Sequence, residues 1–572
     1  MLDHVTLTVL HYRLQQITEE MDVILDRAAF SPIISEGRDR ASGIFSPVDG
    51  KLIAQGMTGM PIHVGAMQFA AATIAGRSGH RPGDIYIIND PYLGGTHLMD
   101  VKLLMPVYAE GELFCFLGTS GHWPDIGGSV PGGFVTQAVE VQQEGLRIGG
   151  VKICREGRME EDILRLILDN LRVPDQRVGD LQAQIACLRA GEAQVARLVA
   201  DYGLAIVKAG IDQLRGASAD LVRGRIAELE PGRYTFEDAI DNDGIDDVPL
   251  WIRLDLTVEA DRLVFDFSRS SAPCRGPMNS VIATTASAVY VALKHVYPDI
   301  PMNAGCFDPV EVIAPTSTFL NVGYPKPVSG CAAEVSQRVV DVAFGAIAQA
   351  MPGELHGAPF GSAINVAIGG YDPQQEKHYV FYFYSGGGAG GYEGGDGLSN
   401  ACSTVGLAKT PPLEVVEQQT PILFERYAMR PDSFGPGKYR GGLGVDYKLR
   451  LRRGEARLSV LGDRARFQPY GIEGGGAASS TEIEMERAGR PYHPLLGAKD
   501  EGVEIAAGDS FSCRTPGGGG FGPARARDPA CVERDLRMGF MTPAFATRNF
   551  HAEAGAAPEA DRYADEMESG NG

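Results

Sequence analysis

Apolar residues near the start of the chain recur at every third or fourth position. Between Val5 and Leu25 the recurring residues are leucine, isoleucine and methionine, at positions 7, 10, 14, 17 and 21. Such spacing places them on one face of an amphipathic helix. The pattern predicts a helix over 5–25 that packs on the region behind it.

Residues 40–125 have a different pattern, in which short runs of β-forming residues are broken by turns. The stretch GIFSPVDGKLIAQG contains an Asp-Gly pair typical of a hairpin, and DIYIIND and ELFCFLGTSGH have the composition of strands. The preceding helix and these runs together predict a mixed α and β region.

Helical spacing returns between residues 160 and 229, where Pro174 separates two of the expected helices. Residues 232–268 alternate as expected for antiparallel strands with one solvated face, and SVIATTASAVYVALKHVYP follows as a buried helix. Beyond Pro352, glycine-rich loops alternate with strand-like runs. The final stretch is small, acidic and without periodicity, which favours disorder.

These patterns predict an α+β, multidomain protein with a β-rich C-terminal half. The predicted segments are a mixed α/β region carrying a candidate metal site (1–155), a helical segment (156–230), a mixed sheet and helix region (231–350), a β-rich glycine-loop region (351–545) and a disordered acidic tail (546–572).

Charge and cysteine usage narrow the possible functions. A formal net charge of -21 disfavours nucleic acid as a partner. The nine cysteines include no CxxC pair, so neither a disulfide framework nor a thiolate zinc site is expected. Without a signal-peptide pattern or a run of about 20 apolar residues, we expect a cytoplasmic protein with no membrane partner.

The densest group of chemically active residues lies in NDPYLGGTHLMD and GHWPDIGG. His97 and Asp100 are three residues apart, and His122 ends the next strand-like run. Two imidazoles and a carboxylate suit manganese, iron or zinc and leave positions for water or substrate. Histidines beside glycine loops also commonly hydrogen-bond the backbone, so the spacing alone leaves both interpretations open.

Neighbouring polar residues have simpler explanations. Asp90 and Asp125 each adjoin a proline and are interpreted as turn caps, although Asp125 is also a candidate for proton transfer. His63, among apolar residues, is interpreted as a core histidine. The glycine runs at 386–397, 435–444 and 515–522 do not match phosphate-binding loops, and turns with close backbone packing explain them better.

Several phrases in order resemble the hydantoinase B/oxoprolinase family, over essentially the full length of the chain. They are SPIISEGRDRASGIFSPVDGKLIAQG, NDPYLGGTHLMDV, GHWPDIGG, QEGLRIGGVK, GPMNS, IPMNAGCFDPVEVIAP, RGGLG and TPGGGGFG. Family members include N-methylhydantoinase B subunits, 5-oxoprolinases, caprolactamases and the large subunits of acetone and acetophenone carboxylases. This chain departs from the usual pattern at SEGRD, at VEVQQEGLRIGGVK and in the GGGAGGYEGGDGLS loop, which leaves the substrate open.

The resemblance implies a divided reaction. A hydantoinase A-type partner with an actin-like ATPase fold would use ATP and Mg to phosphorylate the substrate oxygen, and this chain would complete the reaction within a hetero-oligomer. It implies His97, Asp100 and His122 as ligands of one divalent metal ion (Mn, Zn or Fe), with Asp39 as a further ligand. Glu36 and Asp125 are the candidates for moving a proton.

Two enzymatic hypotheses follow from this resemblance. The first is the metal-dependent subunit of an ATP-dependent ring-opening amidohydrolase for a hydantoin, oxoproline or small lactam. The alternative is the large subunit of an ATP-dependent carboxylase for a ketone such as acetone or acetophenone. A third, non-enzymatic hypothesis is a metal that only stabilises the fold, although structural sites are normally closed by four protein ligands.

Overall fold

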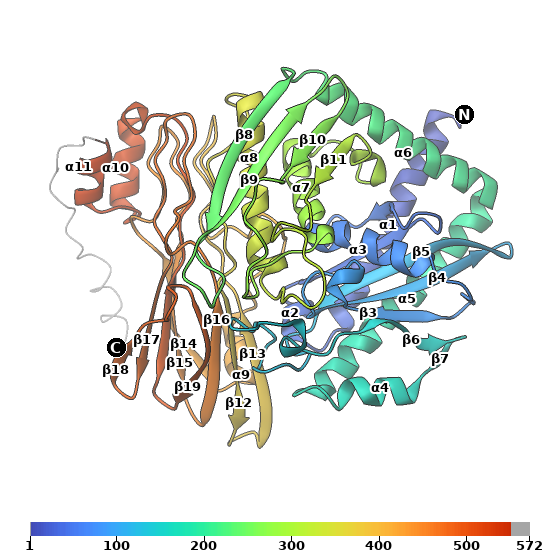
Figure 1. Ribbon diagram of the computed structural model, residues 1–572, viewed down its shortest axis with the longest axis horizontal. Helices are drawn as coiled ribbons and strands as arrows, with labels where there is room; N and C mark the ends of the chain where they lie inside the picture. Colours follow the sequence, from blue (N-terminus) through green and yellow to red (C-terminus); the bar gives the residue numbers. More distant parts are fainter. Residues whose placement is uncertain (1, 551–572) are drawn as a thin grey trace, which may run out of the picture.

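The computed structural model describes residues 2–550 and has two halves (Figure 1). The N-terminal half combines long helices with a large sheet, and the C-terminal half consists of stacked sheets. The described residues form helices and four separate sheets, which confirms the predicted α+β architecture.

The first sheet has seven strands in the order β2-β1-β5-β4-β3-β6-β7, and each neighbouring pair is antiparallel. The predicted hairpin is confirmed as β1 and β2. The strands are β1 (Arg40–Phe45), β2 (Leu52–Gln55), β3 (Ile85–Ile88), β4 (Asp100–Ala109), β5 (Glu112–His122), β6 (Gly149–Arg155) and β7 (Arg158–Met159).

Helices cover both faces of this sheet because side chains alternate along β1 and β5. Ile44 and Leu117 belong to the core shared with α1 (His4–Ala28) and α5 (Pro174–Tyr202), whereas their neighbours in sequence pack against α3 (Pro61–Ala75). The predicted N-terminal helix is confirmed as α1. The other helices of this half are α2 (Pro32–Ser35), α4 (Glu161–Leu168) and α6 (Leu204–Ile226).

A central layer connects the two halves. Helix α7 (Ile282–Val296) packs on α3, and α8 (Ser336–Ala350) packs on α7 and on the second sheet, of order β11-β10-β9-β8. Its strands are β8 (Gly232–Ile240), β9 (Leu250–Val258), β10 (Leu263–Asp266) and β11 (Val310–Ile313). One hydrophobic cluster extends from Leu10 to Leu461, so the first three predicted segments share a single core.

The C-terminal half contains two further sheets, β13-β12-β16-β19 and β14-β15-β20-β17-β18, whose apolar faces enclose a second core. The strands are β12 (Asn365–Asp372), β13 (Lys377–Phe383), β14 (Ile422–Met429), β15 (Val445–Leu451), β16 (Glu455–Leu461), β17 (Glu482–Arg487), β18 (Arg490–Tyr492), β19 (Lys499–Ala506) and β20 (Ser510–Arg514). Helix α9 (Leu413–Gln419) precedes β14.

The chain continues into two helices, α10 (Pro529–Arg537) and α11 (Pro543–Phe550). The predicted tail began at residue 546, but Ala546 is buried beside Phe434 and Phe545 within α11. The apolar residues at 545 and 546 therefore extend ordered structure to residue 550. The remainder of the predicted tail lies outside the described residues.

The glycine-rich segments pack backbone against backbone, as predicted. We call segments 357–361, 386–397, 435–444, 471–476 and 515–522 the glycine assembly. Its hydrogen bonds join main chains directly, including Gly519 N–H to the Ala358 carbonyl at 2.8 Å and Gly442 N–H to the Ala389 carbonyl at 2.8 Å. A Cβ added at Gly518 would lie only 1.9 Å from the Ala389 carbonyl oxygen. Glycine is required there by close approach.

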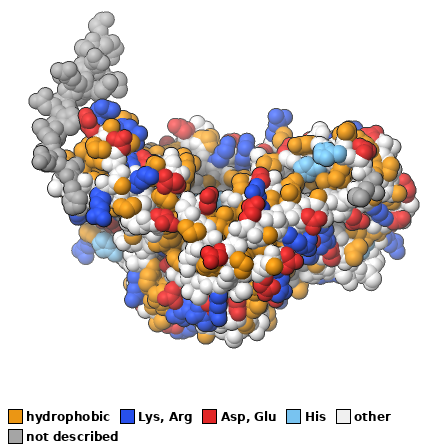
Figure 2. Space-filling view, turned by 90° about the horizontal axis from the view of Figure 1, so that it is seen from above, with side chains coloured by type: hydrophobic (Ala, Val, Ile, Leu, Met, Phe, Trp, Pro, Cys, Tyr) orange, Lys and Arg blue, Asp and Glu red, His pale blue; other side chains and the backbone are white. Residues whose placement is uncertain are grey.

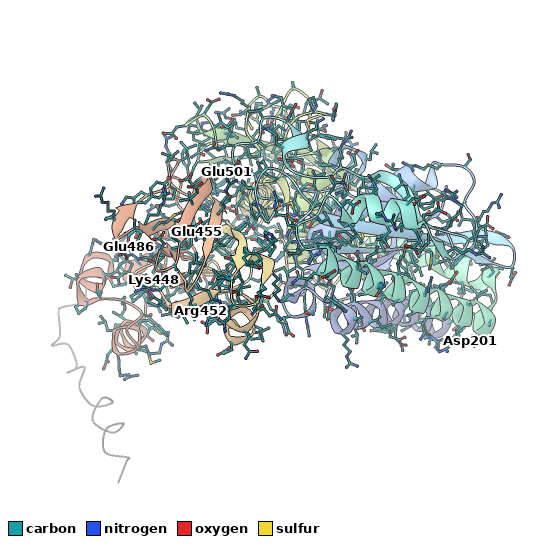
Figure 3. All side chains as sticks on the ribbon, turned by 90° about the horizontal axis from the view of Figure 1, so that it is seen from below. Asp201, Lys448, Arg452, Glu455, Glu486 and Glu501 are labelled. Carbon is teal, nitrogen blue, oxygen red and sulfur yellow. The ribbon has the colours of Figure 1, made fainter. Side chains whose placement is uncertain are left out.

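Charged side chains of both signs are interspersed over the face seen in Figure 2. Arg452, Glu455 and Glu486 are exposed around the C-terminal sheets, and Asp201 marks the far end of the long helices (Figure 3). Among the helices within residues 2–550, none has the combination of length and apolar character that a membrane crossing requires.

Candidate metal centre

Three neighbouring strands of the first sheet bring the candidate ligands to one edge. Asp100 begins β4 and is the cross-strand partner of His122, which ends β5. Asp39 immediately precedes β1, and its carbonyl accepts the His122 N–H at 3.1 Å. His97 lies in the loop before β4. The antiparallel pairing explains the convergence, because the start of β4 and of β1 meets the end of β5.

The side chains of His97, Asp100 and His122 converge on one point and are buried. His97 Nε2 lies 3.0 Å from Asp100 Oδ1 and 3.3 Å from His122 Nδ1. His122 Nδ1 lies 3.1 Å from the same Asp100 oxygen. Two nitrogens and one oxygen thus form a small triangle of potential ligand atoms.

Asp39 and His63 adjoin this triangle. His63, in the first turn of α3, has Nε2 at 3.1 Å from Asp39 Oδ1 and Nδ1 at 3.5 Å from Asp100 Oδ2. The second Asp39 oxygen is 4.0 Å from His122 Nδ1. Asp39 therefore lies beside the triangle, as the resemblance implied, and His63 connects it to Asp100.

Aromatic rings hold the two triangle histidines in place. Tyr382 stacks on His122 with ring centroids 4.9 Å apart, and Phe134 stacks on Tyr382 at 5.2 Å. His97 meets Phe134 edge to face at 5.5 Å. Because Tyr382 follows Phe134 by almost 250 residues in sequence, the C-terminal half supplies part of the wall around the centre.

The protonation states expected here suit metal ligands. Burial lowers the pKa of His97, and the nearby Asp100 only partly opposes that effect, so the imidazole stays neutral. Burial would raise the pKa of Asp100, but His63 and His97 hold it well below its ordinary value. Burial also lowers the pKa of Lys102, whose ammonium donates to Thr96 Oγ1 at 3.1 Å.

Two observations test whether these residues fit a metal ion. Ligand atoms about 2.1 Å from a common ion and about 90–105° apart are separated by about 3.0–3.3 Å, which matches the triangle. In addition, the two imidazoles and the carboxylate are all buried and can each offer one ligand atom to a shared ion. Among the described residues, the ring nitrogens outside the triangle, His97 Nδ1 and His122 Nε2, are buried without a hydrogen-bond partner. The donor set fits a divalent ion.

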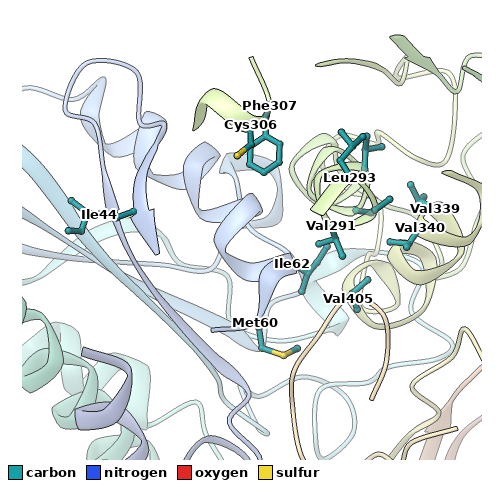
Figure 4. Packing of buried hydrophobic residues seen from close by; sticks show 14 of the residues in the cluster. Ile44, Met60, Ile62, Val291, Leu293, Cys306, Phe307, Val339, Val340 and Val405 are labelled. Atoms are coloured by element: carbon teal, nitrogen blue, oxygen red, sulfur yellow. The ribbon is translucent and has the colours of Figure 1, made fainter. Parts of the chain in front are cut away.

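A cavity of about 50 Å³ borders the centre. Its lining includes polar residues from both halves of the chain, namely His63, His97, Asp100, Gln337, Tyr382 and Tyr384. The segment around Val405 closes the cavity, with the Val405 carbonyl accepting the Ile62 N–H at 3.3 Å. Figure 4 shows Val405 close to Met60 and Ile62.

The two candidates for proton transfer do not line this cavity. Glu36 is exposed at the end of α2. Asp125 is buried, but its two oxygens accept from the Arg172 backbone N–H at 2.7 Å and the Arg172 guanidinium at 2.8 Å. Asp90 does cap a turn, as predicted, by accepting the Tyr92 N–H at 3.0 Å.

Sequence reasoning missed three polar residues of the site. His63 was interpreted as a core histidine, yet its ring joins Asp39 to Asp100. A buried histidine needs hydrogen-bond partners, and the apolar sequence neighbours of His63 cannot supply them. Gln337 and Tyr384 have no local motif, and only the fold brings them to the cavity.

The chain matches known proteins over almost its whole length. A family model described as hydantoinase B/oxoprolinase matches residues 3–524. An uncharacterised protein of Methanocaldococcus jannaschii is 33% identical, with 94% of this chain and 93% of that protein covered. Caprolactamase subunit beta of Pseudomonas jessenii is 30% identical, with 95% and 94% covered.

The 5-oxoprolinase of Dictyostelium discoideum is 30% identical over 91% of this chain, but the chain spans only 40% of that protein. Among solved structures, the ATP-dependent caprolactamase from Pseudomonas jessenii superposes with a TM-score of 0.89 at 26% identity, covering 98% of both chains. An acetone carboxylase structure shares the fold, with a TM-score of 0.88 at 20% identity over 96% of this chain and 79% of that one.

Proposed function

Because this chain belongs to the hydantoinase B/oxoprolinase family, we propose that it is the metal-dependent subunit of an ATP-dependent amidohydrolase. It opens a small cyclic amide after a hydantoinase A-type ATPase partner has activated the substrate oxygen with ATP and Mg. The observation that supports this proposal most strongly is the buried triangle of His97, Asp100 and His122 beside a cavity. The relatives named caprolactamase subunit beta and 5-oxoprolinase support the substrate class.

In this proposal His97, Asp100 and His122 hold one divalent ion, with Asp39 as a fourth candidate ligand. When bound, a manganese, zinc or iron ion would supply Lewis-acid polarisation and positive charge opposite the oxygen of the reacting carbonyl. Residues of the chain itself would transfer the proton and hold the ligand side chains in place.

Asp39 and His63 both line the cavity and lie close enough to exchange a proton. His63 Nε2 and Asp39 Oδ1 are 3.1 Å apart, within the distance of direct proton transfer. His63 lines the same cavity, and its buried Nδ1 lies 3.5 Å from Asp100 Oδ2 without a hydrogen-bond partner among the described residues. We therefore propose His63, in place of the exposed Glu36, as the group that accepts or returns a proton during ring opening.

The small cavity limits the access of bulk water to an activated substrate, yet it has room for the water molecule that hydrolysis consumes. Tyr382 and Phe134 keep the His122 ring in one orientation, so its Nδ1 remains directed at Asp100. The arrangement is typical of a site that is organised before substrate arrives.

The test is to purify the chain with its ATPase partner and to measure metal content, ADP release and ring-opened product with hydantoin, 5-oxoproline and ε-caprolactam. His97→Ala and His122→Ala should each lose the metal and reduce product formation at least 100-fold, with the fold retained. His295→Ala is the control, because His295 is a histidine on α7 that is not part of the candidate centre and whose Nδ1 lies 3.0 Å from the Val291 carbonyl oxygen.

Retention of full turnover by both variants would refute the metal centre. The same complex supplied with acetone and labelled bicarbonate tests the carboxylase alternative. Incorporation of label into an acid product, without turnover of any cyclic amide, would overturn the amidohydrolase proposal.

A further inference from the structure

Besides the Nδ1 atoms of His63 and His97, two buried polar atoms on residues that line the cavity lack a hydrogen-bond partner in the part of the chain that the structure describes. They are the Oε1 atom of Gln337 and the hydroxyl oxygen of Tyr384. Buried polar atoms are normally satisfied, and each exception requires an explanation. Gln337 and Tyr384 line the same cavity as His63, His97 and Asp100.

The orientation of the Gln337 amide follows from its surroundings. Gln337 is fully buried in the first turn of α8, directly after the wide turn Cys331–Val335, and its Nε2 donates to the Ala333 carbonyl. Only the nitrogen can donate to a carbonyl, so the oxygen must point the other way. Gln337 therefore presents a fixed hydrogen-bond acceptor to the cavity.

Tyr384 presents the complementary group. Burial raises the pKa of its phenol well above the ordinary value, so the hydroxyl keeps its proton at neutral pH. A protonated phenol can donate one hydrogen bond. The cavity thus contains one free acceptor and one free donor.

The Tyr382 hydroxyl, on another residue that lines the cavity, already has a hydrogen-bond partner. The Tyr382 hydroxyl donates to Asn365 Oδ1 at 2.9 Å, and Asn365 Nδ2 donates to Glu334 Oε1 at 3.1 Å. Glu334 Oε1 also accepts the N–H groups of Ala363 and Ile364. This network holds the cavity wall, and it leaves Gln337 and Tyr384 to contact a ligand.

We propose that Gln337 and Tyr384 form a substrate-positioning pair that selects the cis edge of a cyclic secondary amide. Gln337 Oε1 accepts the ring N–H, which the O-phosphorylated ring keeps while its nitrogen is protonated, and the Tyr384 hydroxyl donates to the oxygen attached to the ring. In a small ring the amide is forced cis, so its N–H and oxygen lie on the same side, whereas linear amides are trans. A ketone offers no N–H and would leave Gln337 unsatisfied. The inference rests on the proposed function and specifies its substrate class.

The cavity of about 50 Å³ holds a few water molecules but not a ring. Ring binding therefore requires outward movement of the segment that carries Ser403, Val405 and Ala408, which completes the cavity wall. Beyond the Val405 contact, this segment is anchored by the Lys409 N–H, which donates to the Gly37 carbonyl at 2.7 Å. Val405 and Ala408 are also buried in the main hydrophobic cluster, so this movement breaks apolar contacts as well as backbone hydrogen bonds.

Equilibrium binding to the purified complex without ATP tests the pair independently of turnover. Calorimetry would compare 2-pyrrolidone, 2-piperidone and ε-caprolactam with their N-methyl derivatives and with ketones of equal ring size. The wild type should bind the N–H lactam of best ring size about tenfold more tightly than its N-methyl derivative, because the latter leaves a buried acceptor unpaired.

Gln337→Met should weaken binding of the N–H lactam about tenfold and abolish the preference over the N-methyl derivative. Tyr384→Phe should weaken both about equally. Gln349→Met is the matched control, because Gln349 lies on the same helix and its Nε2 makes the same type of bond, to the Gly345 carbonyl at 3.1 Å. Tyr379→Phe is the control for tyrosine, because its buried hydroxyl also lacks a partner among the described residues but lines a different groove.

An unchanged N–H preference in folded Gln337→Met, or no lactam binding by the wild type, would overturn the pair. A different result would refute the proposed function: the complex would open no cyclic amide in the presence of ATP. Turnover that survives with an unaltered N–H preference in Gln337→Met would therefore refute only this inference.

Discussion

His63 Nε2 lies 3.1 Å from Asp39 Oδ1, and the two residues come from different elements, the first turn of α3 and the residue preceding β1. The other ring nitrogen of His63 lies 3.5 Å from Asp100 Oδ2. One imidazole thus connects two carboxylates at the candidate centre.

We expect His63→Asn to weaken metal binding about 10–100-fold, because partners that orient ligand side chains typically contribute that much. Product formation should fall further than metal affinity, since the proposed proton carrier is also lost. Metal affinity would be measured by competition with a chelator, and product formation at saturating metal. Equal metal affinity and rate in His63→Asn and the wild type would contradict both roles.

Tyr382 is expected to act through its ring more than its hydroxyl, since the ring stacks on His122 at 4.9 Å. Tyr382→Phe keeps the stack and loses only the bond to Asn365, so metal affinity should change less than about threefold. Tyr382→Ala removes the stack and should weaken metal binding about tenfold or more. Chelator competition on both variants checks this, and equal losses would show that the hydroxyl carries the effect.

Asp125→Asn should lower stability and leave chemistry intact, because Arg172 engages both carboxylate oxygens. Losing a buried charge-assisted contact costs about 1–3 kcal/mol in the free energy of unfolding. Urea denaturation would report that loss, and Arg172→Ala should show a similar one. A large fall in turnover at saturating metal, without loss of stability, would instead restore Asp125 as a proton-transfer residue.

Glu144 should make stability depend on pH. Its buried carboxyl accepts the Val328 and Ser329 N–H groups, and burial raises its pKa to about 8. Below the unfolded pKa of about 4.3 both states are protonated. Between that value and about 8 the folded state binds more protons, so this contribution to the unfolding free energy falls as pH rises.

Glu144→Gln mimics the protonated acid and removes this pH dependence. Relative to the wild type, the variant should gain roughly 4 kcal/mol of unfolding free energy between pH 5 and pH 8.5. Denaturation curves at several pH values check the slope. Parallel pH profiles for variant and wild type would show that Glu144 is ionised in the folded protein.

Much of the fold follows from local patterns in the sequence. The spacing of Leu10, Leu14 and Met21 predicts α1, and the Asp-Gly turn predicts the β1–β2 hairpin, because both depend on residues close in the chain. The sequence also indicates that His97, Asp100 and His122 lie at or near the ends of strand-like runs. The antiparallel register that brings Asp100 opposite His122 depends on the pairing of β4 with β5 and not on the spacing of these residues.

The remaining site residues depend on packing between distant segments. Tyr382 reaches His122 only because β13 lies beside the first sheet, and Gln337 reaches the cavity through a wide turn that no local spacing predicts. Glu36 is close to Asp39 in the sequence, yet its side chain is exposed and does not line the cavity. Long-range packing decides such cases.

In the glycine assembly, any amino-acid substitution at a position such as Gly441 adds at least a Cβ atom. That atom would lie 1.8 Å from the Gly518 carbonyl oxygen. No rotamer relieves such an overlap, because the atom that collides precedes the first rotatable bond of the side chain. Laboratory evolution toward a new ring size should therefore randomise Gln337, Tyr384 and the segment around Val405. Libraries that also randomise the glycine assembly would consist mostly of variants that do not fold.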